Sequence, residues 1–454
     1  MTDAPHTEPV PKRRSANHWY IFVGLLIGAI GGLIAKAMYP PGEDGKDNPD
    51  LAWAVANVAK PAGEVFLRLI FMIVVPLVVS ALILGVAGLG DARRLGRVGL
   101  KSFGYTVLLS GLAVVIGLGM ANTIQPGSAI SAETREELVA RYADEAEQTM
   151  QRAKAGKSTR DALLDLIPRN PLRELVGATD GSSPGGGILA VMFFALAIGT
   201  ALLFNPARAA PLLAVLEGVF DACMGIIQFA MRLAPIGVAG LMFGLTATVG
   251  VDVLKLLGWF VATALGAMLI QYFVVYSIAI STLGSMSPAR FFSRISEVTL
   301  TAFATSSSNA TLPTALRVAR TRLGLRADVS NFVLTIGATA NQNGTALYEG
   351  ITVLFLCQVF GVQLDLGQQL GLMLICILAG IGTAGVPSGA LPFIALVAAS
   401  YGAPASAIGI IVGVDRVLDM CRTVVNVTGD IVIAACVNRG EAALEPTPAS
   451  AAGP

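Results

Sequence analysis

Several stretches of this 454-residue chain are apolar over the length that is needed to cross a lipid bilayer. About 20 consecutive apolar residues span the roughly 30 Å hydrocarbon core as a helix. Such runs lie at residues 20–38, 65–89, 103–121, 188–204, 212–231 and 257–280. The shorter run at 234–249 is expected to continue the preceding helix beyond Pro235. The hydrophobic fraction of 54%, against 13% charged residues, agrees with an all-α membrane protein.

Basic residues mark the segments that we expect on the cytoplasmic side, because cytoplasmic loops carry an excess of lysine and arginine. They cluster in the N-terminal tail at 1–18, at 93–97 and at 317–326. No small-residue cleavage site follows the first span, so we expect a retained helix. The predicted location is a cell membrane, inner or plasma, with several spans and with both termini in the cytoplasm.

Two polar segments lie outside the predicted spans. Residues 128–187 combine charged, helix-like sequence with a glycine-rich end, and we expect an extracytoplasmic loop. Residues 438–454 are rich in proline, alanine and glutamate and are predicted to be a disordered C-terminal tail. The net charge of +1 gives no reason to expect a nucleic-acid partner.

The positions of the cysteines and histidines give no indication of disulfides, of a zinc site or of an enzyme active site within the membrane. The five cysteines lie in apolar runs at unrelated spacings, so they predict neither disulfides nor a zinc site. Both histidines precede the first span, which leaves no histidine base or metal ligand inside the membrane. The sequence also lacks G-x-S-x-G and H-E-x-x-H motifs, so an intramembrane enzyme is not expected.

Residues 407–437 are long and apolar enough to span a membrane, yet they carry several charges. The polar positions are three or four residues apart and therefore form one stripe on a helix. They are Asp415, Asp419, Arg422, Asn426 and Asp430. A charge at the centre of a membrane helix costs roughly 2.5–3.5 kcal/mol unless it faces protein, water or a ligand. The stripe predicts a buried polar site, and an ion-pair network between helices is the alternative.

A second polar interruption divides the span at residues 332–360. The sequence NQNGT at 341–345 separates two apolar halves, and Glu349 follows one turn later. Irregular backbone at membrane depth is tolerated where it lines a cavity, and its free carbonyl groups can bind a cation. We therefore expect an unwound helix at a binding site, with a simple glycine kink as the alternative.

Two further apolar segments are interrupted by small residues and are expected to be re-entrant hairpins. Residues 301–319 contain TSSSN at 305–309, and residues 372–400 contain a glycine-rich tip at 380–389. A polar membrane helix follows each hairpin, which gives a repeat of hairpin plus helix. Paired interrupted elements are typical of transporters built from inverted repeats. The sequence thus predicts a secondary transporter for a small zwitterionic or acidic molecule.

Four segments, in this order, resemble the dicarboxylate/amino acid:cation symporter family, which includes excitatory amino acid transporter-like glutamate and aspartate carriers. They are 301–313 (TAFATSSSNATLP), 341–350 (NQNGTALYEG), 380–387 (GIGTAGVP) and 415–430 (DRVLDMCRTVVNVTGD). The resemblance covers most of the chain outside the tails and the predicted outer loop. It implies eight transmembrane helices plus two re-entrant helical hairpins in inverted repeats, a homotrimer in the lipid bilayer, and elevator-type motion.

The resemblance also implies a static scaffold and a mobile transport domain. The scaffold takes helices 1–2 at 19–89 and helices 4–5 at 188–250. The transport domain takes helix 3 at 90–127 and the segment 251–437, with helix 6, hairpin 1, helix 7, hairpin 2 and helix 8. The tip of the second hairpin is expected to be the outer gate, because its glycines suit a segment that closes.

By the same resemblance, the substrate site takes residues from both hairpins and from the last two helices. They are Ser307, Ser308, Thr345, Val386, Arg416, Asp419, Arg422, Thr423 and Asn426. Asp419 is expected to accept the substrate's ammonium group, because relatives for C4-dicarboxylates lack this aspartate. Arg422 is expected to bind the side-chain carboxylate through its planar fork. Thr345 supports that carboxylate, while Ser308 and Asn426 are expected to bind the main-chain carboxylate.

The resemblance predicts glutamate or aspartate as the small-molecule substrate. A C4-dicarboxylate carrier of the same family is the nearest alternative, and an ion channel is the alternative from another class. Ser306 stands where many relatives carry an additional arginine, and Arg416 is expected to supply that charge.

The resemblance allows three cation sites of the sodium-coupled family members to be compared with this sequence. Asn343 replaces an aspartate of the sodium-coupled pattern, and Thr106 and Leu109 replace its tyrosine and threonine, so this site is expected to be lost. Two other positions are predicted to be partly kept. One takes Gly337, Asn341, Asn426 and Asp430, and the other takes backbone carbonyls at Thr339, Gly380, Ile381 and Thr383.

Glu349 stands at the place of the proton-carrying glutamate of proton-cotransporting relatives. Burial favours the neutral form of a carboxyl group, which suits reversible protonation. We therefore expect co-transported H⁺, with Na⁺ as the alternative coupling ion, and no other cofactor.

Overall fold

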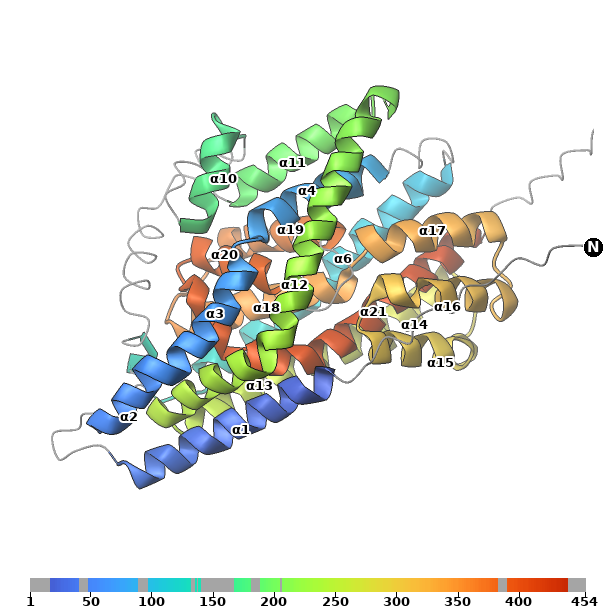
Figure 1. The fold of residues 1–454 in the computed structure, drawn as a ribbon. Helices are drawn as coiled ribbons and strands as arrows, with labels where there is room; N and C mark the ends of the chain where they lie inside the picture. The colour runs from blue at the N-terminus through green and yellow to red at the C-terminus, as the bar shows by residue number, and fades with distance from the viewer. Residues whose placement is uncertain are drawn as a thin grey trace, which may run out of the picture.

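The computed structural model describes residues 17–40, 48–88, 97–131, 135–136, 138–139, 167–180, 188–204, 206–382 and 390–439. Every regular element in these ranges is a helix (Figure 1). Six of the described helical segments are long and apolar enough to cross a membrane. They are Tyr20–Met38, Pro49–Ala87, Arg97–Ser128, Ala207–Thr248, Asp252–Thr282 and Val412–Asn438. The prediction of an all-α protein with several membrane spans is confirmed.

Helix α1 (Asn17–Met38) packs along α12 (Pro206–Thr248), the long helix that crosses the molecule in Figure 1. A Cβ atom at Gly24 or Gly28 would overlap backbone carbonyl oxygens of α12, so the two helices approach at backbone distance. Helix α12 continues through Pro235 without a break. The expectation that residues 234–249 extend the preceding span is therefore confirmed.

The second span begins earlier than its predicted start at residue 65. It consists of α2 (Pro49–Ala54), the π-helix η1 (Val55–Ala59), α3 (Lys60–Phe71) and α4 (Val74–Gly88). The Asn48 side chain caps the first turn by accepting a hydrogen bond of 3.0 Å from the Asp50 N–H. This cap and a proline at the first helical position start the helix about four turns before the most apolar part of the sequence.

Helix α18 (Asn343–Val359) is buried along its whole length apart from Gln358. Helices α6 (Arg97–Ile124), α13 (Asp252–Leu269), α19 (Leu366–Gly382), α20 (Leu391–Ser400) and α21 (Val412–Asn438) surround it. The π-helix η3 (Ile270–Val275) and α14 (Tyr276–Thr282) continue α13. The core around α18 positions the polar residues of the candidate site.

The first predicted hairpin is formed by α15 (Pro288–Thr305) and α16 (Ser308–Thr321), which pack against each other. Its first arm starts well before the predicted residue 301. The interruption in the next span is also present, because α17 (Ala327–Ala340) ends before Asn341 and α18 begins at Asn343. Asn341 and Gln342 have non-helical backbone angles, which confirms the expected unwound segment.

Helices α19 and α20 lie on either side of the second predicted tip. Residues 383–389 of this tip, with Thr383 and Val386, lie outside the described residues, as do the N-terminal tail before Asn17, most of 128–187 and the C-terminal tail after Arg439. The last helix is preceded by the 3₁₀-helix η4 (Ala405–Ile410), so regular α-helix starts at Val412 and not at the predicted 407.

Candidate functional site

The polar stripe of α21 faces the interior of the protein. Its five predicted members are each between 1% and 3% exposed. They are Asp415, Asp419, Arg422, Asn426 and Asp430. Burial of so many polar groups is costly unless each one is hydrogen-bonded or paired. The partners of the stripe therefore decide what the site can bind.

Two arginines bind the carboxylate of Asp419. The Nε atom of Arg422 donates to Asp419 Oδ1 at 2.8 Å, and Arg416 Nη1 donates to Asp419 Oδ2 at 3.1 Å. Arg422 Nη1 also lies 3.4 Å from Asp415 Oδ1. All four groups belong to α21, so these ion pairs do not join one helix to another. The cluster holds two positive and two negative charges that an anionic or zwitterionic ligand can rearrange.

Tyr348 of α18 holds the other side of Arg422. The guanidinium Cζ lies 4.9 Å from the centroid of the tyrosine ring, which is a cation–π contact. The Tyr348 hydroxyl donates to Asp415 Oδ1 at 3.0 Å. Sequence reasoning placed Asp415 in the stripe but gave neither residue a role at the substrate. The sequence signal that could have identified Asp415 is its spacing of seven residues from Arg422, which places both on one helix face. The signal for Tyr348 is its position three residues after Thr345, on the same face of that helix.

Asn426 links α21 to the start of α18. Its Oδ1 accepts hydrogen bonds from the N–H groups of Gly344 (2.7 Å) and Thr345 (3.2 Å). The residue that precedes α18, Gln342, makes no side-chain cap of its own, so Asn426 caps this helix from another element. Asn426 Nδ2 donates to Thr345 Oγ1 at 3.1 Å and to Gln342 Oε1 at 2.5 Å. The structure thus brings together the predicted residues Thr345 and Asn426.

The first hairpin tip carries three serine hydroxyl groups, at Ser306, Ser307 and Ser308. Ser306 adopts a left-handed backbone conformation, with φ of 48°, which turns the chain between the two arms. Ser307 Oγ caps α16 by accepting from the Ala310 N–H at 3.3 Å. The hydroxyl groups of Ser306 and Ser308 are buried and have no hydrogen-bond partner among the described residues. A buried hydroxyl group without a partner is unfavourable, which favours a ligand or water molecule at Ser308.

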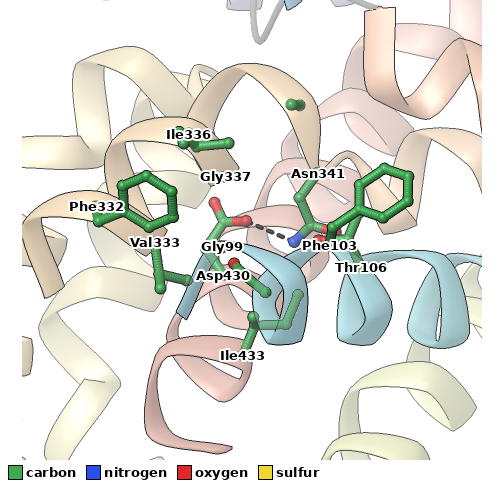
Figure 2. A pocket seen from close by; sticks show the side chains of 12 residues that line it. Gly99, Phe103, Thr106, Phe332, Val333, Ile336, Gly337, Asn341, Asp430 and Ile433 are labelled. Atoms are coloured by element: carbon green, nitrogen blue, oxygen red, sulfur yellow. Dashed lines mark hydrogen bonds between the residues drawn. The ribbon is translucent and has the colours of Figure 1, made fainter. Parts of the chain in front are cut away.

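Three predicted cation-site residues meet in a pocket between α6, α17 and α21 (Figure 2). Asn341 Nδ2 donates to Asp430 Oδ1 at 2.6 Å, and a Cβ atom on Gly337 would lie 2.5 Å from the same oxygen. The Asn341 Oδ1 atom is buried and has no partner among the described residues. A carboxylate and an amide oxygen suit a hard cation. Asn426, the fourth residue, is one turn away and bonds to α18.

Asn343 belongs to a neutral hydrogen-bond network instead of a carboxylate site. Ser110 Oγ donates to Asn343 Oδ1 at 2.6 Å, and Asn343 Nδ2 donates to the Tyr276 hydroxyl at 3.2 Å. Tyr276 in turn donates to the Val425 carbonyl at 2.9 Å. A carboxylate at position 343 would lose the N–H that Tyr276 accepts. The loss of this cation site stays a prediction from the sequence.

Thr423 and the described residues of the second predicted cation site bond mostly to nearby backbone groups. Thr423 Oγ1 donates to the Asp419 carbonyl at 2.8 Å, so its hydroxyl is bonded within α21. The Gly380 carbonyl accepts the Gln342 N–H at 3.0 Å, and the Thr339 hydroxyl donates to the Ile336 carbonyl. Of the second predicted cation site, the structure describes the backbone of Thr339, Gly380 and Ile381 but not Thr383.

Glu349 is completely buried in α18. It follows Thr345 by four residues, which places it about 6 Å further along the helix and on the same face. The predicted proton carrier thus lies in the core, close to Thr345, the predicted substrate residue of α18. All five cysteines are free, and four of them are buried, in agreement with packing roles.

Comparisons with known proteins agree with the resemblance seen in the sequence. Residues 18–440 match the sodium:dicarboxylate symporter family. The proton/sodium-glutamate symport protein of Bacillus subtilis (strain 168) is 31% identical over 430 residues, which cover 94% of both chains. The proton/glutamate-aspartate symporter of Escherichia coli (strain K12) is 30% identical over 416 residues, 91% of this chain and 90% of that one. The C4-dicarboxylate transport protein of Sphingopyxis alaskensis is 30% identical over 443 residues, 96% of this chain and 92% of that one.

Proposed function

Because the chain belongs to the sodium:dicarboxylate symporter family, we propose that it takes up aspartate or glutamate together with cations, with H⁺ favoured as the coupling ion. Family membership makes it a multi-pass membrane transporter and not an enzyme. The observation that carries the substrate proposal is the carboxylate of Asp419 bound by both Arg416 and Arg422. This group offers a negative partner for an ammonium group and two positive partners for a carboxylate.

Substrate binding requires an exchange of partners within this cluster. The side-chain carboxylate of the amino acid takes the planar fork of Arg422, which Tyr348 and Asp415 keep in place. Asp419 then turns to the substrate's ammonium group. The main-chain carboxylate reaches Ser308 and Asn426. Arg416 compensates the charge of Asp419 while these bonds are exchanged.

A C4-dicarboxylate is the alternative substrate, and a C4-dicarboxylate transport protein is among the relatives. Such a molecule has no ammonium group for Asp419. Its carboxylates would draw Arg416 and Arg422 away from Asp419 without offering this aspartate a new positive partner, which leaves a buried charge unpaired. The acidic amino acid is therefore favoured.

Charge balance supports coupling to a cation. The two arginines and the two aspartates 415 and 419 sum to zero, whereas an acidic amino acid carries a net charge of −1. Bringing that charge into a buried site is costly unless a positive charge accompanies it. A proton that an ionised Glu349 takes up together with the substrate offsets the added negative charge, and a sodium ion beside Asp430 and Asn341 is the alternative.

The packing of the helices supports the proposed scaffold and transport domain. Helices α1, α3, α4, α11 (Ile188–Leu202) and α12 pack mostly with one another. Helices α6 and α13 to α21 likewise pack mostly with one another, and fewer contacts join the two groups. Such a division suits an elevator-type motion. The homotrimer, the cytoplasmic termini and the gate at 380–391 remain part of this proposal.

Uptake into proteoliposomes tests the function. We expect labelled aspartate or glutamate to accumulate under an imposed proton gradient in the absence of sodium, and Glu349→Gln to lose this accumulation. Accumulation that needs only a sodium gradient and is unchanged in Glu349→Gln would establish the sodium alternative. Accumulation of succinate but of neither amino acid would replace the proposed substrate.

A further inference from the structure

Gln342 lies in the unwound segment between α17 and α18 and has no assigned role in the substrate site. Its side chain is buried, with 2% exposed, and both ends of its amide group are bonded. The Nε2 atom donates to the Ala338 carbonyl at 3.0 Å, and Oε1 accepts from Asn426 Nδ2 at 2.5 Å. The backbone N–H of Gln342 donates to the Gly380 carbonyl at 3.0 Å. Three hydrogen bonds therefore fix Gln342, and its side-chain oxygen Oε1 is bonded to Asn426.

The bond to Asn426 uses a group that the substrate needs. An asparagine amide has two N–H donors, and both donors of Asn426 are bonded, one to Gln342 Oε1 and one to Thr345 Oγ1. Under the proposed function, the main-chain carboxylate of the amino acid binds this same amide. A carboxylate oxygen therefore has to displace one of the two acceptors.

Asn426 does not depend on Gln342 for its orientation. Its Oδ1 is fixed by the N–H groups of Gly344 and Thr345 at the start of α18. Release of the Gln342 side-chain oxygen would free one N–H donor of Asn426, while the other stays on Thr345 Oγ1. Gln342 is therefore a competitor of the substrate and not the residue that holds Asn426 in place.

We propose that the Gln342 side-chain carbonyl competes with the main-chain carboxylate of the substrate for Asn426 and so sets the affinity of the site. The inference rests on the proposed function, because it requires a substrate with a carboxylate at Asn426. Gln342 is a positioning residue, and its displacement is part of binding. Its other two bonds, from Nε2 to the Ala338 carbonyl and from the backbone N–H to the Gly380 carbonyl, do not involve Asn426.

Two substitutions at this position have opposite expected effects. Gln342→Met keeps the size of the side chain but removes the competing oxygen, so aspartate should bind about fivefold more tightly, the ratio for one hydrogen bond of about 1 kcal/mol. Gln342→Glu replaces the amide by a carboxylate, which binds Asn426 more strongly and repels the substrate's carboxylate. Aspartate should then bind at least fivefold more weakly than to the wild-type chain.

Gln358→Met is the matched control. Gln358 is near the end of α18, accepts from the Gly127 N–H at 3.0 Å and donates to the Ala121 carbonyl at 2.9 Å, away from Asn426. We expect no change in aspartate affinity in this variant. Dissociation constants would be measured by calorimetry on the purified full-length chain, with gel filtration and thermal unfolding as checks on folding.

The outcomes separate this inference from the function on which it rests. Tighter aspartate binding in Gln342→Met with weaker binding in Gln342→Glu supports competition. If one variant does not fold, the direction of the affinity change in the other still tests the inference. Unchanged or weaker binding in Gln342→Met would show that Gln342 only supports the structure, and would overturn the inference while the proposed function stands. If the wild-type chain binds neither aspartate, glutamate nor succinate, the proposed function fails and the inference fails with it.

Discussion

Arg422 is the residue on which the substrate proposal depends most. Its guanidinium group contacts two carboxylates and lies over the ring of Tyr348, with 2% of the residue exposed. Removing the cation leaves the buried carboxylates of Asp415 and Asp419 without this positive partner. A substrate carboxylate would then lie near these two negative charges without the N–H donors of the guanidinium group. The site is therefore sensitive to this side chain in two ways.

We expect Arg422→Ala to weaken aspartate binding by about 2–5 kcal/mol, the cost of leaving a buried charged partner unpaired. Arg317→Ala is the control, because Arg317 pairs with Glu297 while half of its side chain is exposed to solvent. Exposed pairs contribute about 0–1 kcal/mol, so this control should bind aspartate like the wild type. Calorimetry with both variants checks the prediction, and wild-type affinity in Arg422→Ala would remove Arg422 from the site.

The sequence predicted some residues of the site better than others. Asp419 and Arg422 were found because charges are rare in membrane helices and their spacing places them on one face. Gln342 was missed, because its role depends on contacts with Asn426 and Ala338 across a break in the helix. Spacing along one helix carries no information about such contacts between elements.

At the scale of elements, α1 and α12 show how small residues determine packing. A Cβ atom at Gly28 would overlap the backbone of Ala239, whereas at Gly31 its nearest neighbour would be the Phe243 ring at 3.5 Å. The first contact is with rigid backbone, and the second is an ordinary van der Waals distance. Two glycines of the same helix therefore differ in what they tolerate.

We predict that Gly28→Ala lowers the free energy of unfolding of the purified protein by about 1–3 kcal/mol, as at other overpacked sites, and therefore lowers its melting temperature. Gly31→Ala should leave the melting temperature unchanged or raise it slightly, since alanine favours the helix by about 1 kcal/mol over glycine. The two melting temperatures, measured in the same detergent, check the pair. Equal effects of the two substitutions would contradict the close approach at Gly28.

Hydropathy located most of the spans but not all of their ends, and at the predicted span 188–204 the described helix, α11, has 15 residues and is shorter than the six candidate spans. Helix α15, the first arm of the first hairpin, starts at Pro288. Hydropathy did not recognise this start because the first turns of the helix carry Arg290, Arg294 and Glu297. Glu297 pairs with Arg317 and Arg322, so that the polar part of this arm is bonded to its neighbour. The start of α2 at Pro49 likewise depends on the Asn48 cap and not on apolar residues. Local caps and ion pairs set these boundaries.

At the scale of the whole molecule, the proposed scaffold and transport domain meet at small residues. A Cβ atom on Gly413 at the start of α21 would overlap the Leu25 side chain of α1, and a Cβ atom on Gly409 would lie 3.4 Å from Leu241 of α12. These contacts join the two groups of helices. If one group moves relative to the other during transport, residues 25 and 413 must separate.

A crosslink at this contact tests the proposed motion. We expect the pair Leu25→Cys and Gly413→Cys to form a crosslink with a short thiol-specific reagent and to lose aspartate uptake until the crosslink is reduced. The control pair is Gly63→Cys and Leu241→Cys, because a Cβ atom at Gly63 would lie 2.5 Å from Leu241 and both positions belong to the proposed scaffold. Crosslinking of that pair should leave uptake intact. Full uptake by the crosslinked first pair would show that α1 and α21 stay together, and the elevator proposal for this chain would be wrong.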